Sequence, residues 1–192
     1  MDILELMKTR RTFRRFDQSK AIPQEVIEAM RQAVRYSSTG RNGQDMYYIF
    51  VQDPALVEAI FPYTHYAAAL PPEEGQPKEG EHPRLFVVLL ERSPKHNSID
   101  DVNAGIGMAN ISAVAWVSGV GSVILRNINK SGIGEVLGIP ADRINTVVAF
   151  GYPTHKVHLV DVPTDGNLNY YLDENRDYVV PKKAMEETSE IR

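Results

Sequence analysis

Residues 9–16 read TRRTFRRF and gather four arginines within six positions, directly behind a short N-terminal stretch of helical pattern. The segment suits an extended chain, on which successive side chains alternate between two sides. Arg10, Thr12 and Arg14 then share one side, and Arg11, Phe13 and Arg15 share the other, where Phe13 can anchor the segment to a core. Two guanidinium groups and a hydroxyl on one side suit a phosphate. A solvated basic surface patch is the alternative, because clusters of like charge often lie exposed.

Composition limits the class of protein. A chain of 192 residues with 43% hydrophobic and 24% charged residues suits one globular domain with a full core. The net charge of −4 gives no global basic field for DNA or RNA, so we expect no nucleic-acid partner. No cysteine is present, which excludes disulfides, thiolate metal sites and a cysteine nucleophile.

The start of the chain carries Asp2 and Glu5 where a signal peptide needs a basic region. The longest nearly uncharged run, 102–125, contains glycine, asparagine and serine, which favours a buried helix over a membrane span. The sequence therefore predicts a cytoplasmic protein with no membrane partner.

Hydrophobic periodicity and turn residues predict a mixture of helices and strands. Helices are expected after Asp2, from Pro23 to about Tyr36, after Asp53, from Asp100 to Gly119, and at 133–137. Strands are expected at 46–51, 85–90, 119–125 and 147–153. Residues 71–83 lack periodicity and predict an exposed, mobile loop, while the chain from His155 onward is polar with short apolar islands. The irregular order of helices and strands indicates an α+β fold around a central sheet.

No familiar catalytic set is present. The five histidines show no HExxH spacing, and Asp100-Asp101 is more simply a helix cap than a catalytic pair. GxSxG, Walker A and GxGxxG motifs are missing. We therefore expect no metal ion and no catalytic side chain. The anion-binding and amide-rich loops are typical of a protein that binds a cofactor to carry out its chemistry.

Four segments in order resemble motifs of the FMN-dependent nitroreductase family. They are the basic segment 10–14, the stretch YSSTGRNGQ at 36–44, GVGS at 119–122 after the long helix, and GYP at 151–153. The resemblance implies an α/β/α sandwich with a central mixed, mainly antiparallel sheet, formed by a single domain over 1–192. It also implies a homodimer in which the C-terminal tail, about 155–192, wraps the partner subunit.

The resemblance further implies that the chemistry is that of the cofactor FMN, bound by both subunits. It assigns the FMN contacts to Arg10, Arg11, Thr12, Arg14, Ser38, Thr39, Gly40, Asn42, Gln44, Ile124, Leu125, Arg126, Asn127, Lys182 and Lys183. Arg10, Thr12 and Arg14 would hold the phosphate and ribityl chain, in agreement with the alternation derived above.

The implied activity is hydride transfer from NADH or NADPH through FMN to a small organic acceptor, nitroaromatic or quinone-like. Two departures from the family pattern are Asp45-Met46, where Pro-Trp is common, and Arg126-Asn127, where some members have Glu-Gly or small residues. They keep open a flavin-binding carrier or redox sensor without nicotinamide turnover. A nucleic-acid patch at 10–15 is a third hypothesis, which the negative net charge disfavours.

Overall fold

The computed structural model describes residues 2–93 and 95–192, so Met1 and Pro94 lie outside the described residues. Four strands form the main sheet: β1 (Met46–Val51), β2 (Leu85–Glu91), β3 (Gly121–Leu125) and β4 (Ile144–Gly151). Their order is β1-β2-β4-β3, and each neighbouring pair is antiparallel. β2 and β4 are buried along their whole length, as expected of central strands with continuous apolar runs.

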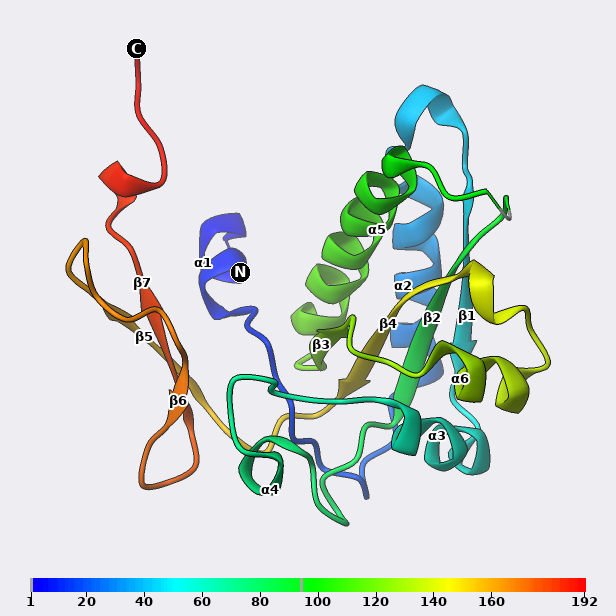
Figure 1. The fold of residues 1–192 in the computed structure, drawn as a ribbon, viewed down its shortest axis with the longest axis horizontal. Helices are drawn as coiled ribbons and strands as arrows, with labels where there is room; N and C mark the ends of the chain where they lie inside the picture. The colour runs from blue at the N-terminus through cyan, green and yellow to red at the C-terminus, as the bar shows by residue number, and fades with distance from the viewer. Residues whose placement is uncertain (1, 94) are drawn as a thin grey trace.

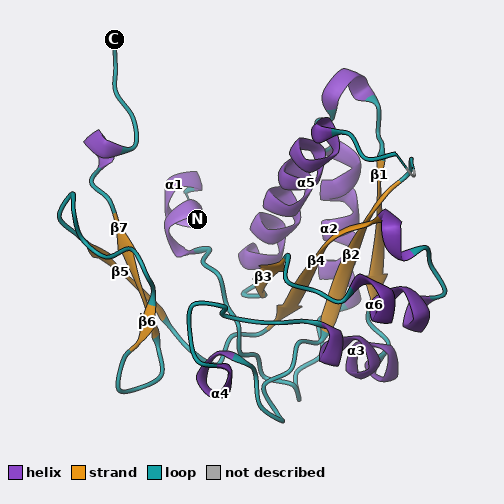
Figure 2. Cartoon of the chain, in the orientation of Figure 1, coloured by secondary structure: helices purple, strands orange, loops and turns teal. Residues whose placement is uncertain are grey.

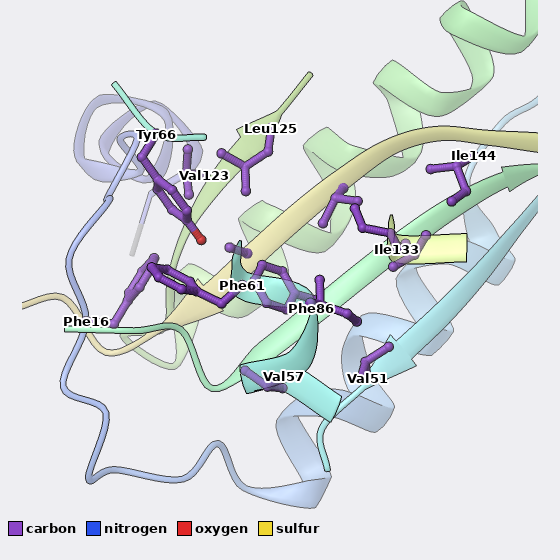
Figure 3. Packing of buried hydrophobic residues seen from close by; sticks show 14 of the residues in the cluster. Phe16, Val51, Val57, Phe61, Tyr66, Phe86, Val123, Leu125, Ile133 and Ile144 are labelled. Carbon is purple, nitrogen blue, oxygen red and sulfur yellow. The ribbon is translucent and has the colours of Figure 1, made fainter. Parts of the chain in front are cut away.

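Helices cover both faces of this sheet (Figure 1). On one face lie α2 (Gln24–Tyr36) and α5 (Ser98–Val117), which pack on Leu85, Val87 and Leu89 of β2. On the other face lie α3 (Pro54–Ile60) and α6 (Lys130–Leu137), which pack on the alternate residues of β2. Figure 3 shows Phe86 of β2 in this second layer, among Val57 of α3 and Ile133 of α6. The predicted α/β/α sandwich with a mainly antiparallel sheet is confirmed.

Side-chain caps define where several helices begin. The carboxylate of Asp2 accepts from Leu4 N–H at the start of α1 (Ile3–Thr9), and Asp53 caps α3 in the same way, as predicted. The long helix α5 begins at Ser98 and not at Asp100, because Asn97 is its cap and Asp100 completes a reciprocal capping box. β4 and α6 each begin three residues before the predicted start.

The chain beyond Gly151 forms a second, smaller sheet that the polar composition did not predict. It contains β5 (Val157–Asp161), β6 (Tyr171–Leu172) and β7 (Tyr178–Lys182), with β5 and β7 parallel. Figure 2 shows these strands on the side of α1, apart from the main sheet. The short helices are α4 (Pro72–Gly75), within the expected loop 71–83, and the 3-10 turns η1 (Gly40–Asn42), η2 (Phe61–Tyr63), η3 (Ala141–Arg143) and η4 (Met185–Glu187).

No helix within the described residues combines the length and the apolar character that crossing a bilayer requires.

Gly121 tests how closely the N-terminal segment packs on the main sheet. A Cβ at Gly121 would lie 2.6 Å from the Pro153 ring and 2.7 Å from the Phe13 ring. Gly121→Ala should therefore destabilise the fold by about 1–3 kcal/mol. Gly105 within α5 has no such neighbour within 4 Å, so Gly105→Ala should stabilise by about 0.5–1 kcal/mol. Urea unfolding of both variants measures the difference, and equal midpoints would contradict this packing.

Candidate functional site

The basic segment 10–16 runs as an extended chain along the outer edge of β3. Thr12 forms a parallel β-bridge with Ser122, and the Phe13 N–H donates to the Ser122 carbonyl at 2.9 Å. Phe13 is buried and stacks on Trp116 of α5 with ring centroids 4.8 Å apart. Phe13 is thus the anchor that the alternation predicted, and the bridge fixes the arginines around it beside β3.

A cleft of about 400 Å³ opens between this segment and β3. One wall is formed by Arg10, Arg11, Thr12 and Arg14, and the base by residues 122–127. The remaining lining comes from Ser112 of α5, His65, Ala67 and Ala68 after η2, and Tyr170 before β6. Eight residues of the sequence-predicted set therefore line one cavity: Arg10, Arg11, Thr12, Arg14, Ile124, Leu125, Arg126 and Asn127.

The cleft is positively charged and lacks internal compensation. In the part of the chain that the structure describes, no carboxylate forms an ion pair with Arg10, Arg11 or Arg14. Burial and, secondly, repulsion from Arg10 lower the pKa of the Arg11 guanidinium below its ordinary value. All three arginines are half-buried, which distinguishes them from a solvated patch.

Three polar atoms at the cleft also lack hydrogen-bond partners among the described residues. They are the buried Nε atoms of Arg10 and Arg11 and the hydroxyl of Ser112, a residue that is 1% exposed. A buried polar atom without a partner is costly and is a common feature of ligand sites. Unpaired cations together with unpaired donors fit an anionic, oxygen-rich ligand such as a phosphate ester.

Arg14 and Arg15 have different roles, although they are adjacent. The Arg14 guanidinium lies over the rings of Tyr170 and Tyr178, 4.4 and 4.7 Å from their centroids. Arg15 is 4% exposed, lies 3.8 Å from a Glu81 oxygen and donates to the Arg176 carbonyl. Arg15 therefore joins segments of the fold, while Arg14 faces the cleft.

The predicted loop residues Ser38, Thr39, Gly40, Asn42 and Gln44 do not line this cleft. Gly40 N–H donates to the Asn103 side chain in the N-terminal half of α5, and the loop lies beside the start of that helix (Figure 1). Arg41, Asn42 and Gln44 adopt left-handed φ values of 55°, 54° and 51°, a conformation that asparagine tolerates and that is uncommon for arginine and glutamine. Such conformations cluster at functional sites.

The predicted pair Lys182 and Lys183 also lies outside the cleft. Lys182 ends β7, where its carbonyl accepts from the Val162 N–H at 3.0 Å, and both side chains are exposed. Neither this pair nor the loop 38–44 lies at the cleft of its own chain. Their contact with a cofactor stays a prediction that requires a second chain.

Sequence reasoning did not identify Ser112, His65 or Tyr170 as site residues. His65 belongs to no metal-ligand spacing, and Ser112 lies within the nearly uncharged run 102–125, where the sequence predicts a buried helix. Tyr170 was noticed as part of an apolar island in the tail, which was the one available signal. Arg126, although predicted, turns its guanidinium toward Asp101 at 3.3 Å.

The family model described as "Nitroreductase family" matches residues 7–152, a range that contains every lining residue of the cleft except Tyr170. No curated protein matches the chain in sequence. Several solved structures share the fold, all at low sequence identity.

A nitroreductase family protein from Clostridium novyi NT has a TM-score of 0.67 at 20% identity, over 80% of this chain and 86% of that one. An FMN-dependent nitroreductase from Clostridium difficile R20291 has a TM-score of 0.64 at 17% identity, over 80% and 89%. A nitroreductase with bound FMN from Bacteroides fragilis NCTC 9343 has a TM-score of 0.62 at 19% identity, over 80% and 89%. At such identities the likeness concerns the fold.

The charge of the cleft predicts that simple anions stabilise the protein. Inorganic phosphate at about ten times its Kd should add roughly 1.4 kcal/mol to the free energy of unfolding. Arg11→Gln should lose much of this gain, whereas Arg31→Gln should keep it, since Arg31 is exposed and paired with Glu28 at 2.7 Å. Thermal melting with increasing phosphate measures the effect. The same shift in all three proteins would place the anion elsewhere.

Proposed function

The chain belongs to the nitroreductase family, and from this premise we propose that it is an FMN-dependent oxidoreductase. Hydride would pass from NADH or NADPH through FMN to a small organic acceptor, nitroaromatic or quinone-like. The observation that carries the proposal is the uncompensated arginine cleft beside β3, within the range that the family model matches. FMN in two structural neighbours and NADH in the names of two others support it by analogy.

The residues of the cleft fit a flavin mononucleotide. Arg10 and Arg14 would bind the phosphate, Thr12 would donate its hydroxyl to neighbouring oxygens, and Ser112 would satisfy its unpaired hydroxyl on the same ligand. FMN, when bound, supplies the two-electron hydride chemistry, so no protein acid or base is needed. The edge of β3 with Ile124, which is 45% exposed, would support one side of the ligand and exclude water there.

A second copy of the chain is part of the proposal. The loop 38–44 and the pair Lys182-Lys183 do not reach the cleft of their own chain, and α1 and α5 expose Leu4, Val102 and Val117 at 74%, 54% and 67%. Exposed apolar side chains on two helices favour a symmetric dimer that buries them. In that dimer the partner's loop and the end of its tail, with Lys182-Lys183, would complete each site, while the tail as far as Tyr178 packs on its own chain. We place this dimer in the cytoplasm, together with its nicotinamide donor.

A flavin-binding carrier or sensor is the second candidate. The ion pair between Arg126 and Asp101 favours this second function. It places a charged residue after β3 at the cleft, where some family members have a small residue. The two functions differ in whether NADH or NADPH reduces the bound flavin.

The visible spectrum of the purified protein tests the proposal. Flavin absorbance, present on purification or after addition of FMN, is expected, followed by rapid bleaching by NADH or NADPH without oxygen. Absorbance without bleaching would support the carrier or sensor. No flavin absorbance even with added FMN would refute both.

Removal of the arginines tests the phosphate contacts. Arg10→Ala or Arg14→Ala removes a charge-assisted contact worth roughly 1.5–3 kcal/mol. FMN affinity should then fall about tenfold to a hundredfold. Quenching of flavin fluorescence measures the Kd, and Arg35→Ala, an exposed arginine of α2, is the control that should leave it unchanged. Unchanged affinity in both cleft variants would mean that the phosphate lies elsewhere.

Mixing two defective chains tests whether each site uses both subunits. Arg14→Ala and Asn42→Ala should each weaken FMN binding when pure. After unfolding and refolding together, about a quarter of all sites should regain tight binding, because one site of each mixed dimer has both residues intact. Recovery is counted by flavin titration, and sedimentation verifies the dimer. No recovery would show that both residues serve the same chain's site, or that the chain is monomeric.

A further inference from the structure

Arg14 is held in the cleft by its backbone as well as by its side chain. Its N–H donates to Nε2 of His155 at 3.0 Å, and Nδ1 of the same ring lies 3.0 Å from the Lys156 carbonyl. A carbonyl oxygen only accepts, so Nδ1 carries the proton and Nε2 is left as the acceptor for Arg14. This arrangement requires the neutral imidazole, because an imidazolium has no acceptor nitrogen.

The ring of His155 is fixed by packing on two sides. It is 7% exposed and lies between Phe13 and Tyr178, with centroid distances of 5.5 and 4.9 Å. Tyr178 is also one of the two rings under the Arg14 guanidinium, the other being Tyr170. Three residues of the C-terminal part of the chain therefore surround one arginine of the cleft.

These residues lie outside the family match, which ends at residue 152. The basic segment and β3 lie within the matched range, whereas the support of Arg14 comes from residues after it, of which Tyr178 begins β7.

We infer that His155 is a positioning residue, whose neutral ring fixes the Arg14 backbone so that the guanidinium can bind the phosphate of a flavin nucleotide in the cleft. The inference rests on the proposed function. It makes ligand binding sensitive to acid through one buried ring, which does not touch the ligand.

The charges around His155 set the pH at which its ring gains a second proton. Burial, and then Arg15 and Arg14, lower the pKa of His155 to about 4, while its hydrogen bond to Lys156 and the carboxylate of Asp177 oppose the shift. The hollow beside the ring is lined by further basic groups, namely Lys8, Arg11, Lys156 and His158. A second proton on His155 would add a cation among these groups and remove the acceptor that holds Arg14.

The sign of the pH effect follows from this depressed pKa. Between the unfolded value of about 6.5 and the folded value of about 4, the unfolded chain binds more protons. The stabilisation from neutral His155 is therefore complete above pH 6.5 and is lost as pH falls toward 4.

Two substitutions separate positioning from simple packing. His155→Gln places a carbonyl oxygen near the position of Nε2, so it can accept from Arg14 but cannot gain a proton. His155→Phe keeps the ring and loses the acceptor. FMN affinity of the wild type and both variants is measured by fluorescence from pH 4 to 8, together with circular dichroism to identify the folded range.

At pH 7, His155→Gln should bind FMN nearly as well as the wild type, and His155→Phe about tenfold more weakly. Below about pH 5, the wild type should lose affinity relative to His155→Gln, since taking the ratio cancels the titration of the FMN phosphate itself. The melting temperature of the ligand-free wild type should likewise fall more steeply below pH 6.5 than that of His155→Gln.

Equal pH profiles of the wild type and His155→Gln in both measurements would overturn the inference. So would His155→Phe binding as the wild type does, or His155→Gln binding as weakly as His155→Phe. His158→Gln is the matched control, because it removes a histidine of the same hollow but leaves the acceptor for Arg14 in place, so FMN affinity at pH 7 should equal that of the wild type. A wild type that binds no FMN at any pH would instead refute the proposed function.

Discussion

The backbone pairing of residues 12 and 13 with Ser122 is the constraint on which the site depends. It adds an extended segment to the open edge of β3 and so brings the arginines of the N-terminus to a strand more than a hundred residues away in sequence. Gly121 permits the approach, because any side chain there would collide with the Phe13 ring. Phe13, stacked on Trp116, then prevents the segment from turning its charges outward. The cleft follows from these contacts.

Concentrating arginines in a half-buried cleft has a cost to the protein alone. Arg10 and Arg11 repel each other, and no described carboxylate offsets them. A bound anion would remove this penalty, so ligand affinity and ligand-free stability are linked in opposite directions. Arg15 shows the contrasting solution, since it is buried further but is paired with Glu81 and a backbone carbonyl. Adjacent residues of one type therefore divide into a functional group and a structural one.

Local signals in the sequence were sufficient for most of the main sandwich. Asp2 and Asp53 predict the helix starts because they act as N-caps, and the continuous apolar run of β2 identifies a central strand. The small C-terminal sheet could not be predicted in this way, because β5 is short and largely exposed and pairs with β7, about twenty residues further on. Alternation predicts that Arg10, Thr12 and Arg14 lie together, but it places Arg11 on the opposite side, whereas Arg11 also lines the cleft. Tyr170 reaches Arg14 only through the tertiary fold, and Asn42 and Gln44 lie outside the cleft of their own chain.

The dependence of Arg14 on His155 also has a consequence for biosynthesis. Arg14 leaves the ribosome early, but the ring that receives its N–H is translated 141 residues later. At ordinary elongation rates this delay is roughly seven to thirty seconds. During that interval the nascent chain carries the arginine cluster, but the Arg14 N–H lacks the acceptor that fixes it. The binding cleft is therefore completed only after His155 and Tyr178 have been translated, later than the last strand of the main sheet, β4, which ends at Gly151.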